Sequence, residues 1–397
     1  MGYLCRNLPS LGWKPVVVCE QLPANHFEFL EHTAEVHAVS ISDHDISRRP
    51  VISRVADSLF HHADRLIEQE AERIMPEHDF KAVLCSTYRL FPLRAAQAVA
   101  RRHRLPLVAD LRDILEEYAP ADAVTRSLPT VFGMDRLIRR MVVSQYVRQR
   151  NRLIAQAACV TTISQWHVEL LRQVNSHTKL IYNGFDETRF FPDYHRQDHF
   201  TITYTGRIVS LQLRDPSLLL QALSQLVRTG QLPPGDVQVR WFVDDASRQL
   251  LRDVLQPYPE LQPMMLLADM QPATDVPRLL NESDIVLVLA NRTQPDGPHG
   301  IMTTKLFETL ATGRPTLCVR SDEAEIERLI QDTQAGLAAR TAEQVSDFIK
   351  TSYAAWRNQS DSAAPTDVRL LKPYSRASQA AQFARILDSI TQPTAQD

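Results

Sequence analysis

The chain has 397 residues, more than one ordinary hydrophobic core holds, so two domains are expected. Its 44 basic and 47 acidic residues give a formal net charge of −3, which argues against a nucleic-acid-binding protein. No apolar run approaches the roughly 20 residues of a membrane-spanning helix. The first residues also do not resemble a signal peptide, so a cytoplasmic protein is expected.

Cysteine usage points to the same compartment. Four of the five cysteines lie inside or beside apolar, strand-like runs, and no spacing of cysteine and histidine resembles a zinc site. We therefore interpret them as small buried hydrophobic residues in a reducing cytoplasm. The five are Cys5, Cys19, Cys85, Cys159 and Cys318.

Short apolar runs alternate with helical patterns along the first half of the chain. The runs predict strands at 16–19, 36–41, 82–85, 105–110, 159–163 and 179–182. The basic, amphipathic stretch 134–154 predicts a helix that covers a core with a solvated outer face. The alternative is a helix that contacts an anionic membrane surface carrying a lipid-linked acceptor, which would place the protein peripherally on the inner membrane face.

The second half repeats this alternation after a polar, aromatic linker at 185–200. Its runs predict strands at 201–206, 237–243, 264–269, 284–290, 315–319 and 335–339. Apolar strands alternating with helices are typical of parallel sheets covered on both faces, so we expect an α/β protein with two doubly wound, Rossmann-like domains. The predicted divisions are an N-terminal domain over 1–190, a C-terminal domain over 191–370, and a helix and tail over 371–397 that pack toward the N-terminal domain.

Ligands of open α/β sheets bind beyond the carboxyl ends of the strands, and the default site of two such domains is the cleft between them. Three segments of the second domain are expected there. The first is the turn with Gly206 and Arg207, followed by Arg214, whose two guanidinium groups suit an anion. The second is the loop 291–302, which includes Gly297 and Gly300. The third is a helix that begins with Lys305.

This helix carries a charged pair near its start, in "TTKLFETLATGRP". Thr303 or Thr304 is expected to cap it through a hydroxyl group, and Gly313 followed by Pro315 is expected to end it. Lys305 and Glu308, three residues apart, are expected to share one face of the first turn. Each signal alone also fits a solvated arginine, a connecting loop or a helix-stabilising glutamate; their convergence favours a site.

Several stretches, in order, resemble the retaining nucleotide-sugar glycosyltransferases of family 4, which have the GT-B fold. They are "VADLRD" (108–113), "CVTTISQWHVELLRQ" followed by "LIYNGFDETRFFP", "YTGRI" with "RDPSLLLQAL", and "KLFETLATGRP". The resemblance extends from about Asn7 to Gly336. It implies two Rossmann-like domains facing each other across a cleft, and a hexosyltransferase-like enzyme of polysaccharide biosynthesis. The implied partners are a nucleotide-diphosphate sugar as donor and a glycan or lipid-linked acceptor, without a nucleic acid.

The resemblance also assigns roles by position. Arg207 matches the arginine that contacts the donor diphosphate, Arg214 aligns with a lysine position of the same task, and Glu308 matches the glutamate that hydrogen-bonds the ribose. Lys305 is expected either to neutralise the phosphates or to pair with Glu308. The remaining expected substrate-binding positions are Gly206, His299, Gly300, Ile301, Met302 and, in the N-terminal domain, Asp113.

Two departures from the family pattern keep other functions open. Gly300 stands where the first glutamate of the paired motif is expected, with His299 as a substitute contact, and the family's first strand and its glycine-rich turn are not found before "RNLPSLGWKPVVV". Either the true start lies upstream, or the chain is a degenerate or repurposed copy. The alternatives are a non-catalytic protein that binds a nucleotide or a partner, and a GT-B sugar epimerase. No cofactor or metal is expected, because Asp244 and Asp245 fit helix caps better than a metal site.

Overall fold

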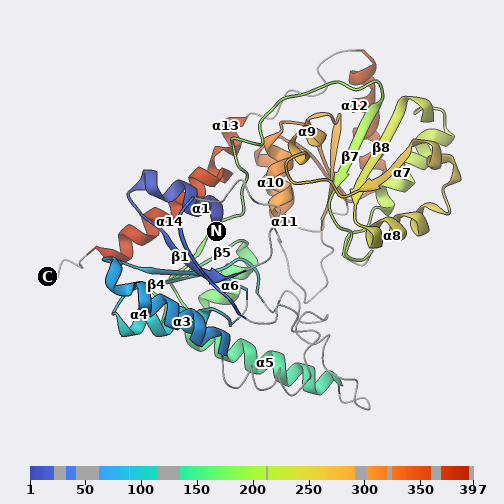
Figure 1. Cartoon of the computed structure of the whole chain (residues 1–397). Coiled ribbons are helices and arrows are strands. Elements are labelled where there is room, and N and C mark those ends of the chain that lie inside the picture. Colours follow the sequence, from blue (N-terminus) through green and yellow to red (C-terminus); the bar gives the residue numbers. More distant parts are fainter. Residues whose placement is uncertain are drawn as a thin grey trace. The chain divides into compact units, whose positions relative to one another are not determined.

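The computed structural model describes residues 1–21, 33–41, 62–88, 90–114, 116, 135–211, 213–290, 302–319, 324–358 and 368–392. The chain forms two compact units, each with its own internal contacts (Figure 1). Unit 1 comprises Met1–Tyr182 and Gln379–Asp397, and unit 2 comprises Asn183–Ser378.

The described residues of unit 1 include six parallel strands in two sheets. β1 (Val16–Glu20) pairs with β2 (Glu35–Val39). The second sheet has the order β3-β4-β5-β6. Its strands are β3 (Val83–Thr87), β4 (Leu107–Leu111), β5 (Cys159–Thr162) and β6 (Thr178–Leu180).

The helices of unit 1 cover these strands, and the last helix of the chain shares its core. The helical segments are α1 (Gly2–Asn7), η1 (Leu8–Leu11), α3 (His62–Ile74), η3 (Met75–Glu77), α4 (Leu93–Arg102), α5 (Asp135–Ile154), α6 (Gln165–Arg172) and α14 (Arg376–Thr391). Phe383 and Leu387 of α14 pack in one cluster with Leu4, Val108 and Ile181. Burial of these apolar side chains is what holds α14 on unit 1.

Unit 2 is built on one six-stranded parallel sheet of order β12-β11-β10-β7-β8-β9. Its strands are β7 (Phe200–Thr205), β8 (Val237–Val243), β9 (Met265–Asp269), β10 (Ile285–Leu289), β11 (Thr316–Val319) and β12 (Gly336–Ala339). β7 lies between β10 and β8, so its carboxyl end is where the strand order reverses, which is the usual ligand position of a doubly wound sheet.

Helices follow the strands of unit 2 in alternation. They are α7 (Ser217–Arg228), η5 (Pro234–Asp236), α8 (Asp245–Leu255), η6 (Pro259–Met264), α9 (Val276–Asn281), α10 (Thr304–Ala311), α11 (Ala324–Asp332), α12 (Ala342–Arg357), α13 (Val368–Leu371) and η7 (Lys372–Tyr374). α7 and α12 pack together over a core that includes Phe200 and Trp241, both fully buried.

The α/β class and the parallel strands expected from the sequence are confirmed. All twelve expected strands are present, each within two residues of its predicted ends. One feature differs from a simple doubly wound pattern: among the described residues, the six strands of unit 1 form two sheets, with β1 and β3 both at sheet edges. The absence of a family strand before β1 stays a prediction.

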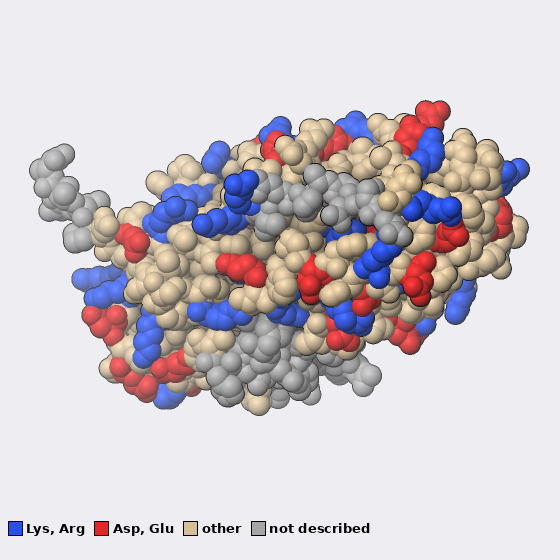
Figure 2. Space-filling view, turned by 90° about the horizontal axis from the view of Figure 1, so that it is seen from above, with Lys and Arg blue, Asp and Glu red and all other residues tan. Residues whose placement is uncertain are grey.

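The surface and the cysteines can be compared with the expectations from composition. Acidic and basic side chains are intermixed on the face seen in Figure 2. The five cysteines are free thiols, and all except the half-buried Cys19 are buried. Within the described part of the chain, no helix combines the length and apolar character needed to cross a membrane.

Candidate functional site

The turn after β7 brings a glycine and a lysine into direct contact. Gly206 has a φ of +128°, which L side chains rarely adopt, and its N–H donates to the carbonyl of Phe242 at 2.9 Å. A Cβ placed on Gly206 would lie 1.6 Å from Lys305 Nζ. The backbone angle therefore favours glycine here, and the absence of a side chain leaves room for the lysine amine over the turn.

Arg207 is held by the start of α8, the helix that follows the neighbouring strand β8. Its Nε lies 3.2 Å from Asp244 Oδ2, while Asp244 Oδ1 accepts from the N–H of Ser247 and caps α8. Ser247 Oγ in turn accepts from the N–H of Ile208 at 2.8 Å. Since Asp244 engages Nε, the two terminal nitrogens are the part of the guanidinium that a phosphate would approach.

Arg214 and Tyr204 fix the backbone of the same turn. Arg214 Nη1 donates to the carbonyl of Arg207 at 2.6 Å, and the Tyr204 hydroxyl donates to the same carbonyl at 3.0 Å. The turn therefore carries two guanidinium groups within one hydrogen-bonded structure.

The third cation of the site has an altered pKa. Loss of hydration around the amine, followed by repulsion from Arg214, lowers the pKa of Lys305 to about 8. The side chain as a whole is exposed, but its amine lies against Gly206. Arg207, Arg214 and Lys305 thus place positive charge at one point, opposed by the carboxylate of Asp244. Such a cluster favours a ligand with more than one negative charge.

The helix α10 begins at Thr304 and ends at Ala311, with Thr303 as N-cap, close to the expected bounds. Two details of the sequence prediction were wrong. The Thr303 side chain makes no capping hydrogen bond, and Glu308 is the fifth residue of the helix, so it lies in the second turn. Among the described contacts, Lys305 and Glu308 form no ion pair; the lysine amine lies at Gly206 instead.

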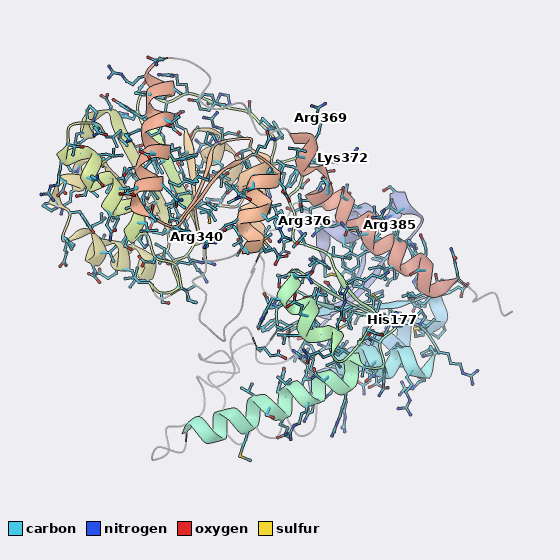
Figure 3. The ribbon with its side chains drawn as sticks, turned by 180° about the vertical axis from the view of Figure 1, so that it is seen from behind. His177, Arg340, Arg369, Lys372, Arg376 and Arg385 are labelled. Carbon is cyan, nitrogen blue, oxygen red and sulfur yellow. The ribbon has the colours of Figure 1, made fainter. Side chains whose placement is uncertain are left out.

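Glu308 lies among three cations within unit 2. Burial raises the pKa of its carboxyl group, and the positive charges of Arg376, Arg189 and Lys305 act in the opposite direction. Arg376, labelled in Figure 3, is the first residue of α14 and comes shortly after η7. The carboxyl group in the second turn of α10 is therefore only partly hydrated, and its oxygens can accept hydrogen bonds from a polar ligand.

Neighbouring segments support α10 from behind. Phe307 is fully buried, and its ring packs against Tyr374 with centroids 5.4 Å apart. Asn183 Nδ2 donates to the carbonyl of Met302 at 2.9 Å. The Met302 side chain is buried in the protein.

The other expected residues are either outside the described part of the chain or in unit 1. His299, Gly300 and Ile301 lie outside the described residues. Asp113 belongs to unit 1, just after β4. In the same place the structure reveals Asp110, which sequence reasoning did not single out as a separate residue: it is fully buried and accepts from Ser86 at 2.8 Å and Thr161 at 2.7 Å.

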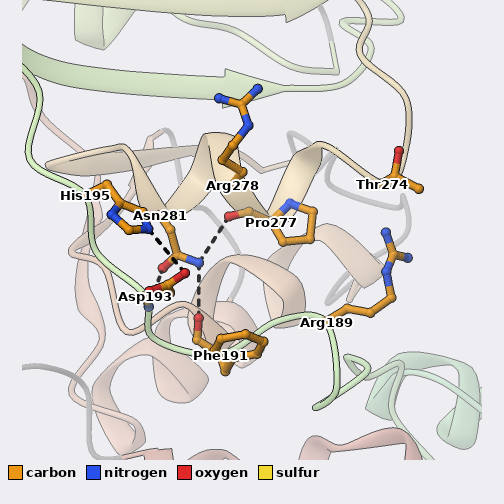
Figure 4. Close-up of a pocket in the computed structure, with 8 residues that line it drawn as sticks. All are labelled: Arg189, Phe191, Asp193, His195, Thr274, Pro277, Arg278 and Asn281. Carbon is orange, nitrogen blue, oxygen red and sulfur yellow. Dashed lines mark hydrogen bonds and ion pairs between the residues drawn. The ribbon is translucent and has the colours of Figure 1, made fainter.

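A separate open pocket of about 280 Å³ lies between the segment after Asn183 and α9 (Figure 4). Arg189 lines it and donates to the carbonyl of Ala273 at 2.5 Å. Asn281 closes its floor by donating to the carbonyls of Phe191 and Pro277, both at 3.1 Å. Arg189 also acts electrostatically on Glu308.

Comparison with solved structures identifies the fold. A structure of Anabaena HepE with UDP and glucose aligns with a TM-score of 0.60 and 16% identity, covering 98% of this chain and 96% of that chain. A glycosyltransferase from Rickettsia africae aligns with a TM-score of 0.65 and 12% identity, covering 99% and 94%. Sucrose-phosphate synthase from Thermosynechococcus elongatus aligns with a TM-score of 0.62 and 12% identity, covering 97% and 91%.

No family model and no curated protein sequence matches the chain. The structural similarity nevertheless spans nearly the whole chain and nearly the whole of each neighbour. The chain therefore has the GT-B fold with two Rossmann-like domains, as expected from the sequence.

Proposed function

We propose that this protein is a retaining glycosyltransferase, similar to family 4, that moves a sugar from a nucleotide-diphosphate sugar to a glycan or lipid-linked acceptor in the cytoplasm. The observation that carries the proposal is the convergence of Arg207, Arg214 and Lys305 at the carboxyl end of β7. In the GT-B fold, this places three cations at the switch point of the C-terminal sheet.

The proposed chemistry follows from these charges. Cleavage of the bond between sugar and phosphate builds negative charge on the leaving nucleoside diphosphate. Guanidinium and ammonium groups held in place before the reaction stabilise that charge. Asp244 serves this step indirectly, since it holds Arg207 by Nε and leaves the terminal nitrogens toward the ligand. No enzyme nucleophile is assigned.

Glu308 is proposed to bind the ribose of the donor. A carboxylate accepts hydrogen bonds from both hydroxyl groups of a diol. The charges of Arg376, Arg189 and Lys305 partly offset the effect of burial, which raises the pKa of this carboxyl group. The neighbour structures of HepE with UDP and with UDP-glucose support a nucleotide-sugar donor for this fold.

We further propose that the transfer needs no metal. Asp244 caps α8 and contacts Arg207, while Asp245 contacts Arg248, so both carboxylates have protein partners. Turnover should therefore continue in excess EDTA. Loss of turnover that Mg²⁺ or Mn²⁺ restores would contradict this proposal.

The test of the main proposal has two steps. Thermal unfolding is first measured with UDP-, GDP- and ADP-sugars, and release of free sugar from the stabilising donor is then assayed. Stabilisation with hydrolysis or transfer supports the enzyme. Stabilisation alone supports the second candidate, a nucleotide-binding protein without catalysis, which is favoured by Gly300 at the position where the family pattern has a glutamate. No stabilisation by any nucleotide would overturn both.

A further inference from the structure

A cluster of histidines and glutamates lies in unit 1, where β2 meets α3 and η3. Glu35 and His37 come from the same face of β2, Glu70 from α3, and Glu77 and His78 from the end of η3 and the residue after it. Strand and helix normally meet through apolar side chains, so this polar group is unusual at such a place. The donor site of the proposed transferase lies in unit 2 and does not use it.

Two imidazole nitrogens converge on one oxygen of this cluster. Glu35 Oε1 lies 3.0 Å from His37 Nε2 and 3.2 Å from His78 Nε2. One ligand atom each of Glu35, Glu77 and His78 lies within 4.8 Å of the other two. Bonds of roughly 2.0–2.2 Å to a tetrahedral ion place neighbouring ligands about 3.4 Å apart. The His78–Glu35 separation already matches this value, and Glu77 would need only a small inward movement.

The third ligand, Glu77, would leave an ion pair with Arg73 at the surface to make that movement. The Glu77 side chain is 47% exposed, and its partner in the cluster is Arg73, whose own side chain is 53% exposed. The side chains of His78 and Glu35 are 25% and 35% exposed, so solvent reaches the ligands. An open hollow of about 540 Å³, lined by His37, Glu70 and Arg73, lies beside them. An ion could therefore enter without unfolding of the surrounding strands.

Arg73 fixes the orientation of His37. His37 Nδ1 lies 3.0 Å from Arg73 Nη2 and 3.2 Å from Glu70 Oε1, while Nε2 faces Glu35 Oε1 at 3.0 Å. Arg73 Nη2 also donates to Glu70 Oε1 at 2.7 Å. His37 thus hydrogen-bonds a carboxylate that could bind an ion, which is the usual role of a residue in the outer shell of a metal site.

The charge of the cluster also suits a cation. With neutral imidazoles, the three carboxylates of Glu35, Glu70 and Glu77 are opposed by two positive charges, Arg73 and Lys14, and Lys14 acts on Glu35. Imidazole nitrogen together with carboxylate oxygen is a ligand set that suits zinc and related divalent transition metals, whereas magnesium prefers oxygen alone.

We propose that Glu35, Glu77 and His78 bind a divalent transition-metal ion of the zinc type, with His37 orienting Glu35. The ion would join β2 to η3 and so stabilise the two-stranded sheet of unit 1. The site is independent of the proposed transferase activity, and sequence spacing gave no signal for it, because Glu35 and His78 are far apart in the chain.

The test is titration of the tag-free, full-length protein with ZnCl₂ at neutral pH by isothermal calorimetry, with MgCl₂ as the comparison ion. We expect one zinc ion per chain, a rise in the unfolding temperature, and no binding of magnesium. His37→Ala should weaken zinc binding by roughly 10–100-fold, the usual cost of losing an outer-shell partner. Glu35→Gln, Glu77→Gln and His78→Ala should each weaken it at least as much.

His103→Ala is the matched control. His103 Nε2 lies 2.9 Å from Glu72 Oε2 of α3. This is also a contact between a histidine and a glutamate, but neither residue is a proposed ligand. This variant should bind zinc as the wild type does. Glu77→Gln changes an exposed side chain, so it should fold normally. It therefore still tests the proposal if another variant fails to fold. Absence of zinc binding by the wild type, or equal affinity in wild type, Glu77→Gln and His78→Ala, would overturn the proposal.

Discussion

Lys305 shows how neighbouring groups control a single side chain at the candidate site. Its folded-state pKa of about 8 lies below its ordinary value of 10.5. Between these two values the unfolded chain holds more protons than the folded one, so stability rises with pH through this window. Below about pH 8 the charged amine is held at a cost, and an anionic ligand would relieve it.

This reasoning predicts proton uptake when a nucleoside diphosphate binds. The phosphates should raise the pKa of Lys305, so near pH 8 binding should take up a fraction of a proton, and affinity should fall as the pH rises above 8. Calorimetry in buffers of different ionisation enthalpy measures this uptake. Lys305→Met should abolish it; an unchanged uptake in that variant would show that another group titrates.

The two arginines give a second prediction at the same scale. Arg207→Ala and Arg214→Ala should each weaken diphosphate binding by about 1.5–3 kcal/mol, because each removes a charge-assisted hydrogen bond. Arg228→Ala, which removes an exposed arginine at the end of α7, is the control and should leave the affinity unchanged. If all three variants bind alike, the phosphate site is not at the β7 turn.

Glu308→Gln tests the proposed contact with ribose. The amide keeps the shape of the side chain but offers one acceptor oxygen, so the preference for a ribonucleotide over its 2′-deoxy analogue should shrink. The fold should survive the change. Burial raises the pKa of Glu308, so its ionisation destabilises the folded state as the pH rises through the raised pKa, and a neutral amide avoids that cost. The measurement is the ratio of the two affinities in wild type and variant; equal ratios would leave Glu308 only a structural role.

The types of these residues and their order along the chain were enough to predict them from the sequence. Contacts between residues far apart in the chain were not predicted. It brought Arg207, Arg214 and Lys305 together because strand ends of a parallel sheet meet at one edge. It interpreted Asp244 as a helix cap but not as the partner of Arg207, since that contact joins residues that follow two different strands. It also placed Glu308 in the first turn of α10, because helix ends cannot be read from sequence to a single residue.

At the scale of elements, the turn after β7 and the start of β12 both depend on glycine, for different reasons. A Cβ on Gly336 would lie 2.1 Å from the carbonyl oxygen of Thr316, which is backbone and cannot move aside. A Cβ on Gly206 would meet the end of the Lys305 side chain, which can move. Both glycines have positive φ, so any side chain at either position adds backbone strain.

Gly336→Ala should therefore lower the unfolding temperature more than Gly206→Ala. Backbone strain alone costs on the order of 1–3 kcal/mol, and Gly336→Ala adds a clash inside the sheet. Gly230→Ala is the control for strain alone, because it has a φ of +72° and nothing within 4 Å of the added Cβ. In Gly206→Ala/Lys305→Ala the steric part should be relieved. A loss in Gly336→Ala no larger than in Gly230→Ala would contradict the clash.

The strands were predictable and their division between sheets was not. Each buried strand is a short apolar run between turn residues, a signal that is local in sequence. Pairing of β1 with β2 but not with β3 is decided by contacts between distant segments, which leave no local pattern. The cluster at Glu35 was not predicted for the same reason, because its members come from β2, α3 and the end of η3, which are far apart in the sequence.

At the scale of the whole molecule, two units with separate cores should respond to different ligands. A ligand that binds only the folded state stabilises it by about 2.7 kcal/mol at 100 times its dissociation constant. A nucleoside diphosphate should act first on unit 2, where Arg207, Arg214 and Lys305 lie, whereas zinc should act on unit 1.

Hydrogen exchange read by mass spectrometry separates these responses. UDP, or whichever nucleotide stabilises the protein, should slow exchange most in 200–211 and 304–311, since ligand contacts there oppose local opening. Zinc should slow exchange most in 35–39 and 75–78. Arg207→Ala should remove the first pattern and keep the second, and His78→Ala should do the reverse. If the nucleotide instead protects 35–39 and leaves the β7 turn unchanged, the donor site is not in unit 2, because a bound ligand must stabilise the segments that hold it.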